Sequence, residues 1–395
     1  MRHLPRLCPL PKMSFFLFGP RGVGKSTWLA DQLKGAKTFS LLDQGVFLAL
    51  SRTPSLLREW VAETSPGAWI CVDEIQKLPA ILDEVHLLME RTGHKFALTG
   101  SSARKLRRAG TNLLAGRAIT LRMEQFTFHE LRGRKLSLDR MLELGGLPLV
   151  ISRPREAHQI LNAYVNTYLR EELIEEGIVR RLEPFSRFLQ AAGQYNGQIL
   201  NLEHLSREAA VPRSTAEIYF EILEDTLIGY RLPSYSIGLR KKEVEAPKFY
   251  FFDPGVARAA AGTLGESLDS IARGFAFETW LFHELRVFFN HRGRDPRIFH
   301  YRTHDGLEID FVIEVKRKTL ERPAQVVLIE AKATDAYDSR WSKAMEGFNL
   351  GRENKVTVAG KYLVYLGKKS FSTANGTHVL PFQEFTDEMA AGRIF

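Results

Sequence analysis

The sequence predicts a mixed α/β protein with several domains. The chain has 395 residues, more than one domain of about 100–150 residues needs, and 44% of them are hydrophobic, so it can bury a large core. In its first third, short apolar runs alternate with amphipathic segments, a pattern typical of parallel strands separated by helices. In its last third, a helical pattern precedes four strand-like runs, which predicts a second, mixed sheet.

Composition and charge limit the classes of protein to which this chain can belong. Lysine and arginine number 55 against 46 aspartates and glutamates, a formal net charge of +9. This surplus favours a polyanionic partner, although an ordinary solvated surface would also account for it. The two cysteines, Cys8 and Cys71, are too few to crosslink secreted domains of this size, and no apolar run reaches the roughly 18 residues of a membrane span. We therefore expect a cytoplasmic protein.

Changes of pattern along the chain divide it into four segments. They are an α/β core (residues 1–127), a helical lid and linker (128–187), a helix-turn-helix followed by two strands, as in a winged helix (188–263), and a helix followed by the second sheet (264–395). No internal repeat is evident, so these segments are expected to be different folds.

A glycine-rich motif follows the first apolar run. Residues 19–27 read GPRGVGKST, match G-x-x-x-x-G-K-[ST], and lie between a predicted strand and a predicted helix. In such a loop the amides face phosphates, Lys25 reaches the β and γ phosphates of ATP, and Ser26 binds Mg²⁺; a plain glycine-rich turn is the alternative. The predicted nucleotide-binding residues are Gly19, Pro20, Arg21, Gly22, Val23, Gly24, Lys25, Ser26 and Thr27.

Polar residues follow the next apolar strands. Asp73 and Glu74 end the run at 69–72, where an aspartate can hold magnesium and a glutamate can polarise the attacking water; an acidic pair that begins a helix is the alternative. The run at 95–98 is followed by three hydroxyls, and we expect one of them to sense the γ phosphate: Thr99, Ser101 or Ser102. Cys71 lies inside an apolar strand and is expected to be a buried, unreactive thiol.

The segment 101–123 is basic and contains no acidic residue. It can supply an arginine finger to a neighbouring subunit's phosphate, it can line a polyanion, or it can be a solvated helix surface. Its basic residues are Arg104, Lys105, Arg107, Arg108, Arg117 and Arg122.

The predicted helix-turn-helix has an unusual charge pattern. Its second helix, residues 214–225, is acidic, and because phosphate attraction dominates DNA affinity it would read a major groove poorly. Two alternatives stay open: non-specific DNA contact through the strands, or a structural or oligomer-contact role. The basic residues of the strands are Arg231, Arg240, Lys241, Lys242 and Lys248.

A carboxylate and lysine motif marks the second sheet. Asp310 lies near the start of one strand and Glu330-Ala331-Lys332 ends the next, and strand alternation puts Glu330 and Lys332 on one face. If the strands pair, Asp310 and Glu330 can share Mg²⁺ while Lys332 stabilises developing charge, with Glu278 as a third carboxylate. Metal-dependent cleavage is one interpretation; nucleic-acid docking or a structural role is the other. Nearby arginines that could support a polyanion are Arg286, Arg292, Arg294, Arg297 and Arg302.

Together these motifs resemble the AAA+ ATP-binding proteins that carry a C-terminal restriction-endonuclease-like domain. The resemblance extends from Ser14 to the end of the chain and rests on FFLFGPRGVGKSTWL, WICVDEIQKLP, FALTGSSARKL, LLAGR, FTFHEL and GGLP. It implies that Lys25 and Ser26 act in Walker A, Asp73 and Glu74 in Walker B, Ser101 in the sensor and Arg117 as arginine finger. It also implies the nuclease-like set of Glu278, Asp310, Glu330 and Lys332.

The predicted fold is therefore an α/β P-loop AAA+ ATPase domain with a helical lid, a winged helix-turn-helix, and a C-terminal mixed-sheet restriction-endonuclease-like domain. Such a protein would hydrolyse ATP with Mg²⁺, act as a homo-oligomer, with a hexameric ring as one option, and remodel or move along DNA. Metal-dependent cleavage is left open. The alternative is an ATP-dependent switch or assembly scaffold whose inactive nuclease-like domain binds a protein.

Overall fold

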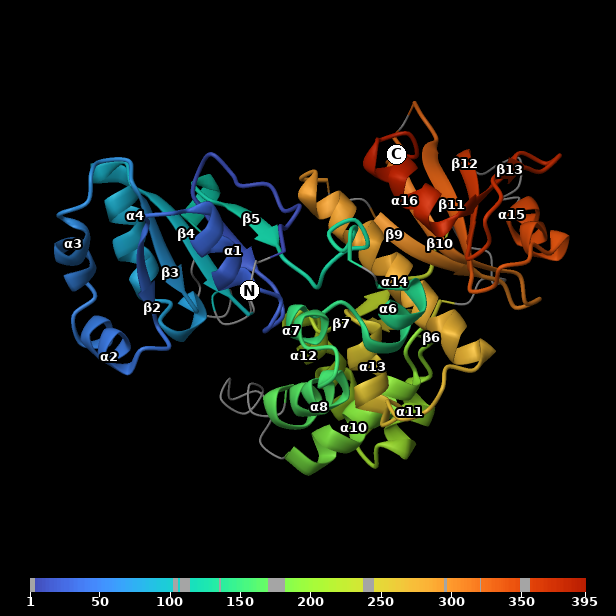
Figure 1. The fold of residues 1–395 in the computed structure, drawn as a ribbon, viewed down its shortest axis with the longest axis horizontal. Helices are drawn as coiled ribbons and strands as arrows, with labels where there is room; N and C mark the ends of the chain where they lie inside the picture. Colours follow the sequence, from blue (N-terminus) through green and yellow to red (C-terminus); the bar gives the residue numbers. More distant parts are fainter. Residues whose placement is uncertain are drawn as a thin grey trace. The chain divides into compact units, whose positions relative to one another are not determined.

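The computed structural model contains two compact units (Figure 1). One comprises residues 1–126 with 222–228, and the other comprises 127–221 with 229–395. The structure describes residues 4–101, 106, 114–134, 136–169, 182–236, 245–294, 297–319, 321–348 and 356–395. Within these ranges, no helix is both long enough and apolar enough to cross a membrane. The cytoplasmic location stays a prediction.

In the first unit, the described residues form a sheet of five parallel strands in the order β2-β3-β4-β1-β5. All four residues of β1 are buried, as expected of a parallel strand covered on both faces. The strands are β1 (Phe15–Phe18), β2 (Lys37–Ser40), β3 (Trp69–Asp73), β4 (Lys95–Gly100) and β5 (Ile119–Arg122).

Helices cover both faces of this sheet. On one face Phe15 contacts Trp28 of α1, while on the other Phe16 and Phe18 stack and pack in a cluster that includes Val85 of α4. The helical elements are α1 (Lys25–Gln32), α2 (Gln44–Arg52), α3 (Leu56–Val61), η1 (Ile75–Lys77), α4 (Ile81–Thr92) and η2 (Leu114–Gly116). Because all five strands run the same way, the segments after β1, β3 and β4 meet at one edge.

The second unit begins with helices, as the pattern of 128–187 predicts. α13 packs against α6, α8 and α10. The elements are α6 (Leu138–Leu144), α7 (Pro148–Ser152), α8 (Ala157–Ala163), the π-helical segment η3 (Tyr164–Leu169), α10 (Leu182–Gln194) and α13 (Pro254–Ala261).

A helix-turn-helix and a small antiparallel sheet lie between α10 and α13. The second helix, α12, starts one residue before the predicted 214, and within the described ranges the strands pair in the order β6-β8-β7. The elements are α11 (Leu202–Glu208), α12 (Arg213–Asp225), β6 (Gln198–Ile199), β7 (Gly229–Leu232) and β8 (Lys248–Phe251). The winged-helix interpretation stays a prediction.

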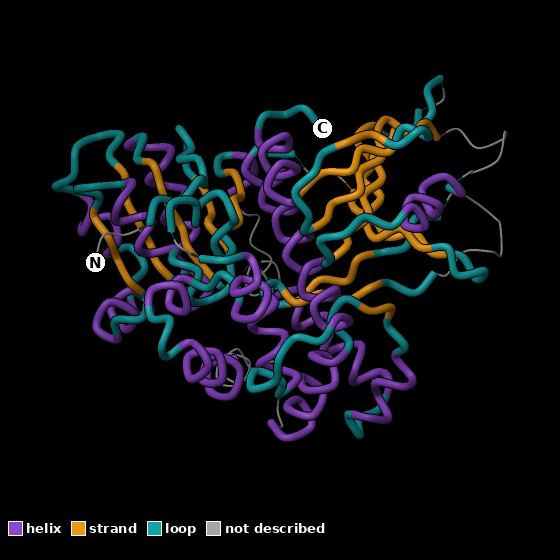
Figure 2. Tube along the Cα trace, turned by 45° about the vertical axis from the view of Figure 1, so that its right-hand side comes forward, coloured by secondary structure: helices purple, strands orange, loops and turns teal. Residues whose placement is uncertain are grey.

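The rest of the second unit is a mixed sheet, whose described strands are hydrogen-bonded in the order β13-β14-β12-β11-β10-β9. Figure 2 draws the strands in orange. β10 pairs antiparallel with β9 and β11, whereas β11, β12 and β14 are parallel, so the predicted mixed sheet is present. The elements are α14 (Ser270–His291), β9 (Arg297–Arg302), β10 (Glu308–Lys316), β11 (Ala324–Lys332), η4 (Ser339–Ser342), α15 (Lys343–Gly347), β12 (Val356–Tyr365), β13 (Phe371–Ser372), β14 (Thr377–Pro381) and α16 (Phe382–Ala390).

Backbone hydrogen bonds join the helix-turn-helix segment to this sheet. Tyr235 donates its amide to the carbonyl of His300 at 2.7 Å, and His300 donates to the carbonyl of Pro233 at 3.0 Å. The chain after β7 thus pairs with β9, across the predicted boundary at 263/264. Apart from residues 222–228, the segments 188–263 and 264–395 belong to one unit, and the boundaries themselves stay predictions.

Candidate functional site

The glycine-rich loop has the backbone that its motif predicts. Gly22 and Gly24 have φ of 76° and 92°, in the left-handed region that favours glycine. At Gly19, an added Cβ would lie 2.0 Å from the carbonyl oxygen of Met123, so only glycine fits there. Lys25 is the first residue of α1, is 6% exposed, and donates through Nζ to the carbonyls of Gly19 at 2.7 Å and Pro20 at 3.1 Å.

Ser26 and Asp73 meet at the edge of the sheet. Oγ of Ser26 lies 3.3 Å and 3.2 Å from Oδ1 and Oδ2 of Asp73, and Thr99, at the end of β4, donates its hydroxyl to Oδ1 of Asp73. A hydroxyl next to a carboxylate is the hard-oxygen donor set that Mg²⁺ prefers in phosphate-binding sites. These residues therefore fit a magnesium ion held between Ser26 and Asp73.

Glu74 is held in a buried network. Its φ is 60°, an uncommon conformation for a non-glycine residue, and its amide donates to the hydroxyl of Thr99 at 3.3 Å. Its Oε2 accepts from Nε2 of Gln76, which also donates to Oγ of Ser101 at 3.0 Å. Glu74 and Ser101, predicted as base and sensor, are thus brought together through Gln76.

A second polar cluster lies where β8, α14 and β10 meet. Along β8, Phe249 and Phe251 contact each other, and Phe249 packs on Phe220 of α12. Side chains alternate along a strand, so Lys248 and Tyr250 point the opposite way. Tyr250 accordingly packs on Phe282 of α14, with ring centroids 5.0 Å apart.

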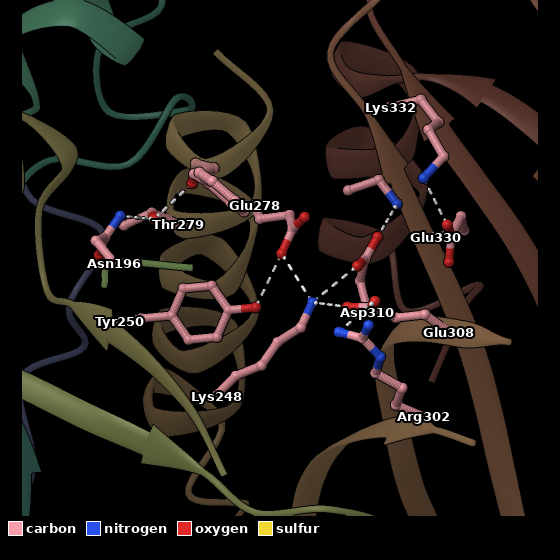
Figure 3. Close-up of polar contacts among 12 residues, drawn as sticks. Asn196, Lys248, Tyr250, Glu278, Thr279, Arg302, Glu308, Asp310, Glu330 and Lys332 are labelled. Atoms are coloured by element: carbon pink, nitrogen blue, oxygen red, sulfur yellow. Dashed lines mark hydrogen bonds and ion pairs between the residues drawn. The ribbon is translucent and has the colours of Figure 1, made fainter. Parts of the chain in front are cut away.

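Lys248 inserts its ammonium among three carboxylates (Figure 3). Its Nζ lies 2.6 Å from Oε1 of Glu308, 3.1 Å from Oδ1 of Asp310 and 3.2 Å from Oε2 of Glu278, and its side chain is 3% exposed. The hydroxyl of Tyr250 donates to the same Oε2 of Glu278 at 3.0 Å. The carboxylates thus receive a cation and a hydroxyl donor from one strand.

Burial and neighbouring charges determine which side chains of this cluster are ionised. Burial disfavours the charge of Lys248, but Glu278 and the other nearby acidic groups outweigh it, so the pKa of Lys248 lies well above its ordinary value. Burial and Asp310 raise the pKa of Glu278 to about 7. Asp310 is also buried, yet Lys248 and Lys332 keep its pKa below its ordinary value. The lysine and Asp310 are therefore ionised at neutral pH.

Glu330 and Lys332 lie on one face of β11, as the strand alternation predicts. Nζ of Lys332 lies 2.6 Å from Oε1 of Glu330. Burial and Asp310 raise the pKa of Glu330 to about 8, and its Oε2 has no hydrogen-bond partner among the residues that the structure describes. Antiparallel pairing of Phe311 with Ile329 puts Asp310 beside Glu330, as the sequence requires if they are to share an ion.

A divalent metal does not fit this cluster as it stands. Lys248 occupies Oδ1 of Asp310, the amide of Ala331 donates to Oδ2 at 2.9 Å, and Lys332 occupies Oε1 of Glu330. Among the described residues, no group of three or more His, Cys, Asp or Glu side chains is arranged to hold a metal ion. The predicted metal role of Asp310 and Glu330 is thus without support in the geometry.

The family comparisons match three parts of the chain. Residues 12–132 match the model of an AAA domain. These residues form an AAA domain. Residues 135–267 and 273–385 match two domains of unknown function. The first of these spans both the predicted lid and the predicted winged helix, and the second spans most of the predicted nuclease-like segment. These matches therefore assign no activity to the part of the chain that follows the AAA domain.

Curated relatives match more than half of the chain. Uncharacterised proteins of Mycobacterium bovis and Mycobacterium tuberculosis are each 23% identical over 305 residues, which cover 76% of this chain and 67% of theirs. One of Haemophilus influenzae is 22% identical over 226 residues, covering 53% of this chain and 56% of its own. A solved structure of the replication initiator DnaA, bound to AMPPCP and single-stranded DNA, is 14% identical with a TM-score of 0.27, covering 54% of this chain and 82% of that chain. That score is too low to indicate a shared fold.

Other predicted residues of the AAA domain have mixed outcomes. Arg117 is on the surface and pairs with Glu90 at 2.6 Å, so its role as an arginine finger stays a prediction. Cys71 is buried, as predicted, and burial raises the pKa of its thiol to about 11, so its lack of reactivity stays a prediction that this burial favours. The basic residues Arg104, Lys105, Arg107 and Arg108 lie outside the described residues, as do Arg240, Lys241 and Lys242 near the strands.

Several basic residues predicted to contact a polyanion are engaged inside the chain. For Lys248 the DNA-contact alternative is excluded and the structural one holds, because its ammonium is buried among carboxylates. Arg231 pairs with Glu217, the guanidinium of Arg286 lies 3.5 Å from the ring centroid of Tyr230, and Arg302 lies 3.5 Å from Glu308. Arg292 donates to the carbonyl of Ala390 at 2.6 Å, and Arg297 lies 3.6 Å from Glu314, so at least six of the predicted basic residues outside the AAA domain have contacts inside the chain.

Sequence reasoning did not single out Gln76 or Tyr250, counted Thr99 only among the hydroxyls that follow residues 95–98, and named Lys248 only as a basic residue of the strands. Thr99 and Gln76 contact the acidic pair of the AAA domain, and Lys248 and Tyr250 contact Glu278. The sequence does contain a signal for Lys248. It lies two residues before Tyr250 in an otherwise apolar strand, so both polar side chains are on the same face of that strand. For Gln76, an uncharged residue in a short helix, the sequence held no comparable signal.

Proposed function

We propose that this protein hydrolyses ATP at the glycine-rich loop of its AAA domain. One observation carries the proposal: the Ser26 hydroxyl lies 3.2 Å from the Asp73 carboxylate, beside the loop that begins α1. The loop amides and Lys25 would bind the phosphates, and Ser26 and Asp73 would hold Mg²⁺. Glu74 would polarise the attacking water once its carboxylate is free to do so.

Removal of the loop lysine tests this proposal. Lys25→Ala should abolish ATP turnover and leave the circular dichroism spectrum unchanged. Lys34→Ala, which removes an exposed lysine just after α1, is the matched control and should keep full turnover. Unchanged turnover in Lys25→Ala would contradict the proposal.

We further propose that Arg117 acts in a neighbouring copy of the chain, within a homo-oligomer. It is exposed, and its pairing partner Glu90 is also exposed, so the pair is weak enough to exchange for a phosphate. Arg117→Ala and Lys25→Ala should each be inactive alone. Mixed, they should regain part of the turnover, because some interfaces combine an intact loop with an intact arginine. Mixtures without any recovery would contradict an action in trans.

For the partner, we propose DNA, bound without sequence preference and remodelled by ATP turnover. The net charge of +9 and the acid-free segment 101–123 support this. The second candidate is a nucleotide-dependent switch or scaffold that binds a protein. It is favoured by the internal contacts of Arg231, Lys248 and Arg286. Metal-dependent cleavage forms no part of the proposal, because Lys248 occupies the carboxylates that cleavage would need.

ATP turnover with and without DNA separates these candidates. Single-stranded, duplex and branched DNA should each be added at several salt concentrations. If DNA is the partner, turnover should rise and binding should weaken steeply as salt increases. If turnover is indifferent to every DNA and binding is absent or insensitive to salt, the protein-binding candidate is the better one.

A further inference from the structure

The cluster around Lys248 contains more acidic groups than most buried ion pairs. Three carboxylates from two elements lie within 3.2 Å of one ammonium: Glu278 on α14, and Glu308 and Asp310 on β10. The Glu308 side chain is 32% exposed, whereas those of Glu278 and Asp310 are only 14% and 5% exposed, and these two would repel each other if both were ionised. A nearby cation offsets this repulsion, and without it one of the two would have to hold a proton. In this chain the cation is covalently part of β8.

The position of the ammonium is fixed by packing. Tyr250, two residues after Lys248, packs in a tilted orientation against the rings of Phe282 and Phe311, and its hydroxyl donates to Glu278. Phe249, on the other face of β8, packs against Phe220. A shift of β8 by one residue would move Lys248 to the opposite face, so the aromatic packing keeps the lysine aimed at the carboxylates.

A magnesium ion would need the same oxygen atoms. It takes about six oxygen ligands at roughly 2.1 Å, whereas the ammonium of Lys248 already lies against one oxygen each of Glu278, Glu308 and Asp310. The remaining oxygen of Asp310 accepts from the amide of Ala331. The ammonium and a metal on these carboxylates would therefore compete for the same oxygens of Glu278 and Asp310.

We propose that Lys248 is a built-in cation that replaces a divalent metal in this cluster, and that removing its ammonium creates a metal site on Glu278 and Asp310. The intact cluster then joins β8 to α14 and β10 as a structural ion-pair centre. This proposal is independent of ATP hydrolysis, since it concerns residues of the second unit alone.

Metal binding by the full-length chain tests the proposal. The probe is Mn²⁺ without nucleotide, in an Asp73→Asn background that removes the predicted metal ligand of the AAA domain. The parent should bind no Mn²⁺ by titration calorimetry or electron paramagnetic resonance. Adding Lys248→Ala should lower the midpoint of thermal unfolding, and Mn²⁺ should restore part of it with one ion bound per chain. Adding Asp310→Asn as well should abolish that binding.

Two results would overturn the proposal. One is a parent protein that binds Mn²⁺ and loses it with Asp310→Asn, since the ammonium would then tolerate the metal. The other is a folded Lys248→Ala variant that gains no Mn²⁺. If Lys248→Ala folds poorly, its refolding yield should be compared in Mn²⁺ and in EDTA. A higher yield in Mn²⁺ supports the proposal that the ammonium replaces a metal, and equal yields refute it.

Discussion

Gln76 donates through Nε2 to Oγ of Ser101 across 3.0 Å, and through the same atom to Oε2 of Glu74. The catalytic carboxylate predicted by the sequence is therefore bound to an amide and buried, at 7% exposure. An oxygen that accepts from Gln76 is less available to accept a proton from water. Gln76 thus connects Ser101, which follows β4, to the Glu74 carboxylate that would accept a proton from water.

Gln76→Ala should raise basal ATP turnover, because Glu74 is released. A hydrogen bond worth about 0.5–1.5 kcal/mol corresponds to roughly a 2- to 10-fold increase in kcat, with little change in KM. Gln76→Leu, which is of similar size and has no amide to donate, should do the same. Steady-state kinetics of the three proteins measure this, and a fall in kcat for Gln76→Ala would show that Gln76 positions Glu74 productively.

Thr99→Val should lower ATP turnover while the protein stays folded. The Thr99 hydroxyl donates to Asp73 and accepts from the amide of Glu74 at 3.3 Å, so its loss frees the metal-holding carboxylate to rotate. A hydrogen bond to a charged group is worth about 1.5–3 kcal/mol, or roughly 10- to 100-fold in kcat. Thr99→Ser keeps the hydroxyl and should retain most of the activity. Equal rates in Thr99→Val and the wild type would exclude this role.

The sequence is informative where local spacing decides the geometry. The loop at 19–27 and the E-x-K pair at Glu330 and Lys332 need only a strand, a turn and the twofold alternation of side chains, and both lie as predicted. Lys248 was different, because the strand KFYF is buried on both faces. Its composition does not say which face meets α12 and which meets Glu278, and tertiary packing alone decides that.

Glu284 should account for part of the change in the free energy of unfolding with pH. It is 3% exposed on α14, accepts from the amide of Phe128 at 2.7 Å, and burial raises its pKa to about 8. The unfolded value is about 4.3, so the folded state holds the proton more tightly. Its contribution to stability is full below about pH 4.3 and is lost as pH rises through 8, with a slope of up to about 1.4 kcal/mol per pH unit.

Urea unfolding of the wild type and Glu284→Gln at pH 5, 6.5 and 8 measures this effect. Glutamine keeps an oxygen that can accept from Phe128 but does not titrate, so the free energy of unfolding of Glu284→Gln should fall less between pH 5 and pH 8. Glu63→Gln, at an exposed position of the first unit, should leave the profile unchanged. Parallel profiles for the wild type and Glu284→Gln would refute the assignment.

Gly145→Ala should destabilise the second unit far more than Gly262→Ala. Both glycines end helices with positive φ, of 73° and 80°, so both substitutions introduce backbone strain of about 1–2 kcal/mol. At Gly145, the added Cβ would also lie 2.0 Å from Oδ1 of Asp253, the buried carboxylate that accepts from the amides of Gly146 and Val256, whereas nothing lies within 4 Å at Gly262. Thermal or urea unfolding should give Gly145→Ala roughly 2 kcal/mol or more of additional loss, because the cap of α13 must move. Equal losses would mean that the chain around Gly145 relaxes without disturbing Asp253.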